Sequence, residues 1–115
     1  MFIDLGAVDL YIKPGPTDMR KQIRGLSLQV ESEMKLNLFS GSLFLFSSKN
    51  RKLLKILYWD KTGFVMWQKK LEKQKFPWPN TEEDARKISM DQFKMLLSGI
   101  DFWNAHEELT YESVL

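Results

Sequence analysis

The 115-residue chain contains no cysteine and a single histidine, His106. Disulfides and thiolate metal sites are therefore excluded, and one imidazole cannot build a histidine-rich site. No apolar run approaches the roughly 20 residues that span a bilayer, and Asp4 and Asp9 interrupt the N-terminal segment where a signal peptide would be apolar. We therefore expect a cytoplasmic protein with no membrane contact, no metal and no other cofactor.

Patterns typical of an active site are also scarce. The chain has no glycine-rich phosphate loop. His106 lacks a nucleophile partner and lies beside Glu107 and Glu108, which is typical of a solvated side chain. Glu33-Met34-Lys35 has the spacing of some metal-dependent nucleases, but it falls at the end of a predicted helix rather than on a strand. We therefore expect no enzyme, and a small nuclease remains a third alternative.

The net charge is small, but the charged residues are unevenly distributed along the chain. The formal net charge is +2, yet residues 49–75 carry nine Lys/Arg against two Asp/Glu, and residues 76–115 carry three against eight. Such asymmetry has two interpretations: a nucleic-acid footprint beside an acidic tail, or two solvated faces that attract each other.

The N-terminal third predicts a strand followed by a helix. The length suits one domain over residues 1–115. The alternation of side chains over residues 7–12 predicts a short strand, which Pro14-Gly15-Pro16 should end. Thr17 is a plausible N-cap for a helix over residues 18–34. Apolar residues recur along one face of that helix: Met19, Ile23, Leu26, Val30 and Met34.

The remaining sequence predicts a meander and a second helix. Residues 43–47, 53–60 and 64–70 favour β-structure and are separated by short polar links. Residues 76–80 read as a proline-bounded linker, and a capping-box pattern predicts a short helix over residues 90–98. We expect an α+β fold: an antiparallel β-meander, joined or not by residues 7–12, an amphipathic helix on one face and a short C-terminal helix. Residues 101–115 form either a third helix or a mobile tail.

The hairpin turn suggests a register. Asp60-Lys61-Thr62-Gly63 fits a type I turn followed by a left-handed glycine. In that register Lys55 faces Lys69 on the side that carries Trp59 and Trp67. Like charges facing each other destabilise a hairpin, so two alternatives follow: the lysines hold phosphates while the tryptophans stack on bases, or the lysines lie over the sheet edge and the tryptophans are core.

A second basic cluster is expected at the start of the first helix. Arg20, Lys21 and Arg24 lie away from the apolar face of this helix. They are close to its N-terminus, where free backbone N–H groups favour an anion. The alternative is a salt link from Asp18 to these basic groups.

Several blocks together resemble one known family. They are GPTDMRK (15–21), GL (25–26), FSGSLFLF (39–46), RKLLKILYWDKTGFVMWQKKLE (51–72), FPWP (76–79) and SMDQFKMLLSGID (89–101). The combination resembles the TnpB accessory protein of the insertion-sequence-sixty-six transposable elements over residues 8 to about 101. The matching blocks emphasise these residues: Thr17, Asp18, Arg20, Lys21, Tyr58, Trp59, Asp60, Gly63 and Trp67.

The resemblance implies a bacterial accessory protein that supports transposition beside a separate transposase, with no established catalytic activity of its own. We first expect DNA binding, at the ends of the element, through a basic surface. Its candidate residues are Arg20, Lys21, Arg24, Lys49, Arg51, Lys52, Lys55, Lys69 and Lys70. The alternative is an assembly module that binds the transposase or forms a homo-oligomer through Tyr58, Trp59 or Trp67.

Overall fold

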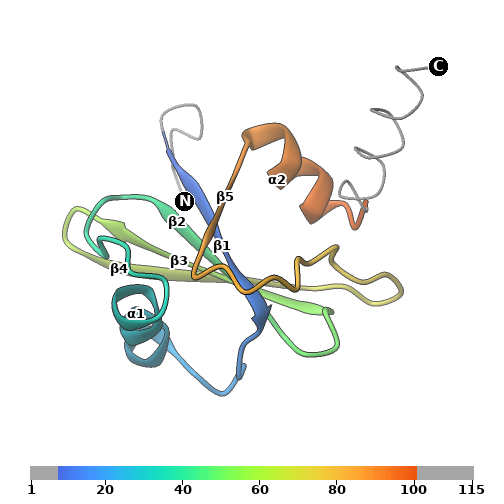
Figure 1. Cartoon of the computed structure of the whole chain (residues 1–115), viewed down its shortest axis with the longest axis horizontal. Helices are drawn as coiled ribbons and strands as arrows, with labels where there is room; N and C mark the ends of the chain where they lie inside the picture. The colour runs from blue at the N-terminus through green and yellow to red at the C-terminus, as the bar shows by residue number, and fades with distance from the viewer. Residues whose placement is uncertain (1–7, 101–115) are drawn as a thin grey trace.

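The computed structural model describes residues 8–100, in which a five-stranded sheet lies between two helices (Figure 1). In chain order the elements are β1 (Leu10–Pro16), α1 (Ile23–Ser32), β2 (Leu43–Ser47), β3 (Leu53–Asp60), β4 (Gly63–Lys70), β5 (Arg86–Ile88) and α2 (Met90–Leu97). The α+β class is confirmed. The alternatives for residues 101–115 lie outside the described residues. Neither helix of residues 8–100 has the length and apolar character of a membrane span.

The strands are ordered β4-β3-β2-β1-β5. β2, β3 and β4 form the predicted antiparallel meander. β1 joins the sheet parallel to β2, with α1 as the crossover between them, and β5 pairs antiparallel with β1. β5 was not predicted, because three residues are too few to carry a period.

β1 continues through the proline-rich stretch that was expected to end it. Its register with β2 shifts between Ile12 and Pro16, so the irregularity falls at the prolines. The Gly15 N–H donates to the Pro79 carbonyl at 3.0 Å. Proline lacks a ladder donor and is tolerated at such irregularities, so the strand bends here instead of stopping.

The first helix begins at Ile23 rather than at residue 18, and Thr17 is not its N-cap. The Thr17 N–H donates to the Ser47 carbonyl at 2.8 Å, which extends the pairing of β1 with β2. Because tertiary hydrogen bonds already use the backbone of this segment, it stays extended and Gln22 occupies the N-cap position. The expected apolar face is still present, since Leu26 and Val30 are fully buried.

Two cores lie on opposite faces of the sheet. The α1 side contains Leu26, Val30, Met34, Leu38, Phe44, Phe46 and Leu57. The α2 side contains Leu10, Ile12, Leu43, Leu45, Leu54, Ile56, Tyr58, Phe76, Trp78, Ile88, Phe93 and Leu96. β2 is buried at every position, as expected for a strand covered on both faces.

The hairpin register differs by one residue from the predicted one. Asp60 pairs with Gly63, which leaves a two-residue turn in which Lys61 takes the positive φ of 52°. Primed turns of this length match the twist of the strands. Since a one-residue shift moves every side chain of a strand to the other face, Lys55 now faces Gln68 and Lys69 faces Leu54.

The predicted linker at residues 76–80 is mostly core. Residues 76–79 are buried, and the Trp78 indole N–H donates to the Lys13 carbonyl at 2.9 Å. The second helix is confirmed. Ser89 and Gln92 form the expected capping box, with the Gln92 N–H donating to Ser89 Oγ at 3.1 Å.

Candidate nucleic-acid interface

The strand directions bring several basic loops to one end of the sheet. β1, β2 and β4 end where β3 begins, so the loops that follow β2 and β4 emerge side by side (Figure 1). The Phe76 N–H donates to the Arg51 carbonyl at 2.7 Å, which joins the two loops directly. We call the cationic residues of these loops and strand ends the basic end: Lys49, Arg51, Lys52, Lys70, Lys73 and Lys75.

The loop between β2 and β3 has a fixed backbone. The Arg51 N–H donates to the Ser48 carbonyl at 3.0 Å, and the Ser48 hydroxyl donates to Asn50 Oδ1 at 2.7 Å. The Lys52 N–H donates to the same Asn50 oxygen at 3.1 Å. Lys49 and Arg51 are exposed, so a loop held by internal hydrogen bonds presents two cations to solvent.

Two adjoining depressions lie beside this loop, and Ser48 and Lys49 line both. The first, of about 310 Å³, also has Arg51 in its wall. The second, of about 590 Å³, includes Thr17 and Asp18. The Thr17 hydroxyl is buried and has no hydrogen-bond partner within residues 8–100, so the family-motif threonine lines the groove formed by the two depressions without exposing its hydroxyl to solvent.

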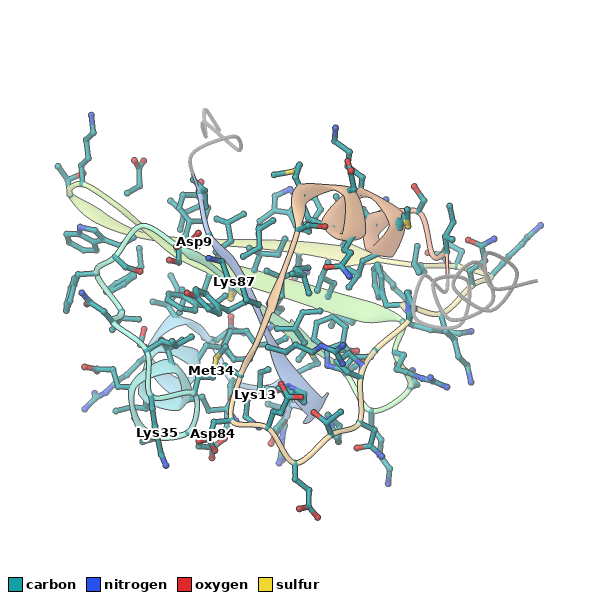
Figure 2. The ribbon with its side chains drawn as sticks, turned by 45° about the horizontal axis from the view of Figure 1, so that its top comes forward. Asp9, Lys13, Met34, Lys35, Asp84 and Lys87 are labelled. Atoms are coloured by element: carbon teal, nitrogen blue, oxygen red, sulfur yellow. The ribbon has the colours of Figure 1, made fainter. Side chains whose placement is uncertain are left out.

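Acidic side chains of the described residues do not neutralise the basic end. Asp84 pairs with Lys35 at 3.5 Å, and Asp9 pairs with Lys87 at 3.2 Å (Figure 2). Within residues 8–100 no residue of the basic end forms an ion pair. Lys73 and Lys75 were not among the predicted site residues, although they belong to the basic stretch 49–75 that the charge count identified.

Lys55 is not at the surface, contrary to the expectation for a phosphate contact. Its exposed fraction is 3%. The ammonium group donates to the Met19 carbonyl at 2.8 Å and to the Lys21 carbonyl at 2.9 Å. Lys55 therefore holds the segment before α1 against the sheet.

Lys69 is also engaged within the fold, on the opposite face from Lys55. Its ammonium group donates to the Leu97 carbonyl at 3.1 Å, at the C-terminal end of α2. A cation there satisfies a free carbonyl and interacts favourably with the helix dipole. The like-charged pair that the predicted register implied does not exist, and only the neighbouring Lys70 is exposed.

The cluster expected at the start of α1 is split by an ion pair. Arg20 and Asp18 form two short contacts, Nη2 to Oδ2 at 2.7 Å and Nε to Oδ1 at 3.0 Å. These hydrogen bonds lower the pKa of Asp18 from 3.8 to about 2. Of the two alternatives expected for this cluster, the structure contains the salt link between Asp18 and Arg20. Arg20 and Lys21 precede the helix, and the exposed Arg24 lies in its first turn.

The aromatic residues of the hairpin do not form one stacking surface. Trp59 contacts Phe39 and Phe64 on the α1 side, with ring centroids 5.1 and 4.9 Å apart. Trp67 packs against the core on the α2 side, and Tyr58 is buried there, which raises its pKa. The expectation that the two tryptophans lie on the same face of the sheet is therefore wrong.

The remaining hairpin residues of the family motif, Asp60 and Gly63, form the closing pair of the turn. This turn lies at the end of the sheet opposite to the basic end (Figure 1). The motif thus maps to two separate places: the groove beside Thr17 and the hairpin.

Comparison with known families identifies the family of the chain. The family model described as IS66 Orf2 like protein matches residues 8–107. The chain belongs to this family. It is therefore a relative of insertion-sequence accessory proteins rather than of a known class of enzyme, and the resemblance stated from the motif blocks is confirmed.

Two curated proteins of Sinorhizobium fredii are similar along most of their length. Uncharacterized protein y4hO is 39% identical over 100 residues, which cover 87% of this chain and 87% of y4hO. Uncharacterized protein y4jC is 32% identical over 87 residues, covering 76% of this chain and 74% of y4jC. No solved structure matches the chain.

Proposed function

We propose that this member of the IS66 Orf2-like family binds DNA through the basic end and so assists transposition of its element. The observation that carries the proposal is the convergence of six cationic side chains on one end of the sheet, without ion pairs inside residues 8–100. Cations that neutralise phosphates release condensed counterions, which drives association with DNA.

In this proposal the DNA backbone binds in the groove beside the basic end. Lys49 lines both depressions, and Arg51 lines one of them. In this proposal a phosphate binds between Lys49 and Arg51, which both line the first depression. Contacts of this kind position a protein on DNA without reading its sequence, so we expect modest sequence preference from this surface.

Fluorescence anisotropy with a duplex from the element end tests the proposal. If all six cations contact phosphates, the logarithm of the association constant should fall with the logarithm of salt concentration with a slope of about −5. Replacing Lys49 and Arg51 together by Ala should make the slope less negative by about 1.8, because each neutralised phosphate contributes about 0.9.

The double replacement Lys35→Ala and Lys87→Ala is the matched control. It removes the same charge from residues that pair with Asp84 and Asp9. The control should leave the salt slope unchanged. Absence of binding at low salt, or an equal effect of both double variants, would remove the basic end as the DNA-binding surface.

A second candidate function is docking of the transposase on the aromatic cluster Phe39, Trp59 and Phe64. The observation that favours it is the 56% exposure of Phe39, since exposed aromatic residues often anchor protein interfaces. In a pull-down with the transposase, Phe39→Ala should abolish capture. Leu28→Ala, which removes a side chain of similar exposure (59%) from α1, should not. Equal capture by both variants would exclude docking at this cluster.

A further inference from the structure

The two edges of the sheet differ in length and protection. The edge strand β5 has three residues, two of them basic, and such short charged edges resist pairing. The other edge strand, β4, has eight residues in unbroken register with β3. Among the strands of residues 8–100, β3 alone pairs with β4, so the backbone groups along the outer edge of β4 have no strand partner within these residues.

The turn defines which backbone groups face outward. In a two-residue hairpin the pair beside the turn is hydrogen-bonded, and bonded and non-bonded pairs then alternate. The Leu71 N–H donates to the Lys52 carbonyl at 2.8 Å, which agrees with this alternation at the far end of the hairpin. The backbone groups that face outward therefore belong to Phe64, Met66, Gln68 and Lys70.

The side chains along this edge are unusually apolar. Phe64, Val65, Met66 and Trp67 follow one another, and each is only half-buried. The strand contains no proline, and its first charged residue is Lys69. An edge with these properties is a template for another strand, and Phe64 also contacts the exposed Phe39, with ring centroids 5.6 Å apart.

We propose that β4 pairs antiparallel with β4 of a second copy of this chain, about a two-fold axis through Met66, to form a continuous ten-stranded sheet. Val65 of each copy then faces Trp67 of the other on the α2 side. Pairs of aromatic and β-branched residues stabilise neighbouring strands. Phe64 faces Gln68 and Gly63 faces Lys69, so no like charges oppose each other within β4.

The neighbouring symmetric registers are less favourable. An axis through Val65 pairs only residues 63–67 of each β4, against residues 63–69 for the axis through Met66, and it brings Lys61 of the turn opposite Lys69 of the other copy. An axis through Trp67 places Val65 opposite Lys69 and Phe64 opposite Lys70, so that apolar side chains face ammonium groups. The sequence of β4 thus selects a second copy in the register centred on Met66.

Disulfide trapping tests the register directly, because the natural chain has no cysteine. Directly opposed, hydrogen-bonded residues have Cα atoms about 5.5 Å apart, within the range that a disulfide bridges. Met66→Cys should therefore form a covalent dimer under mild oxidation. Gln68→Cys should not, because the two cysteines would lie about 14 Å apart in this register. Trapping of both variants would indicate parallel pairing, and trapping of neither would exclude the register; either result overturns the proposal.

Sedimentation velocity without DNA tests the association itself. The natural chain should sediment as a dimer whose population rises with concentration. Gln68→Pro removes an outward-facing N–H from a residue with an exposed side chain, and should yield a monomer. Gln68→Ala retains that N–H and should stay dimeric.

Circular dichroism and thermal melting should show that both Gln68 variants remain folded. A natural chain that is monomeric at its highest soluble concentration would overturn the proposal. So would a folded Gln68→Pro variant that is as dimeric as Gln68→Ala. Because no DNA is present, these results are independent of whether the basic end binds DNA.

Discussion

The ammonium group of Lys55 lies 2.8 Å from the Met19 carbonyl, a hydrogen bond across 36 positions of sequence. The same group reaches the Lys21 carbonyl at 2.9 Å. A lysine in the middle of β3 thereby fixes the family-motif segment that borders the groove. Buried cations are stable only where such partners compensate for lost hydration.

Lys55→Met should destabilise the fold by about 2–3 kcal/mol. The replacement keeps an apolar stem but leaves two carbonyls without their charged donor. Urea denaturation measures the change. Lys49→Met, at an exposed position, should change the free energy of unfolding by less than about 0.5 kcal/mol. Equal effects would contradict a structural role for Lys55.

Lys69 and Lys70 should have separable roles despite being neighbours. Lys69→Met removes the donor to the Leu97 carbonyl and should lower stability by about 0.3–1 kcal/mol. Lys70→Met should leave stability unchanged and make the salt slope of DNA binding less negative by about 0.9. Denaturation and anisotropy on both variants check this. Equal changes in stability and in salt slope for the two variants would contradict separate roles for Lys69 and Lys70.

Arg20→Ala should raise the pKa of Asp18 from about 2 toward its ordinary value of 3.8, since hydrogen bonds from Arg20 are the main cause of the lowering. A depressed carboxyl pKa contributes stability above the unfolded-state pKa. That contribution is lost as pH falls from about 4 to about 2. An NMR titration of the Asp18 carboxyl measures the shift. Arg24→Ala should leave it in place, and a pKa unaffected by Arg20→Ala would contradict the assignment.

Ser89→Ala should lower stability by about 1 kcal/mol, because it removes the side-chain acceptor for the Gln92 N–H at the start of α2. Thermal or urea unfolding measures the loss. Ser98→Ala is a suitable control: the Ser98 hydroxyl is an exposed donor at the other end of the helix. A larger loss for Ser98→Ala than for Ser89→Ala would show that the capping box contributes little.

Local patterns predicted much of the fold. The three strands of the meander and the capping box of α2 follow from short-range preferences that the structure keeps. The Thr17 cap failed for a different reason, because the Thr17 N–H bonds to Ser47 in a neighbouring strand. Cap preferences are worth about 1 kcal/mol, so a sheet hydrogen bond and the contacts of Lys55 can override them.

The candidate site was predicted in part. The excess of positive charge in residues 49–75 located the loop that carries Lys49 and Arg51. The predicted register of the β3–β4 hairpin was wrong by one residue, and it placed Lys55 opposite Lys69. Both faces of β4 carry apolar residues and both are partly covered, so the hydrophobic pattern alone could not decide between two turns that differ by one residue.

Motifs, periodicity and composition are properties of the chain, and they were enough to predict the kinship of this protein, its α+β class and the stretch where positive charge accumulates. Which lysines remain available to an anion could be seen only in the folded protein. Burial and long-range hydrogen bonds commit Lys55 and Lys69 to the fold, and such partners depend on strand order and register rather than on neighbouring residues.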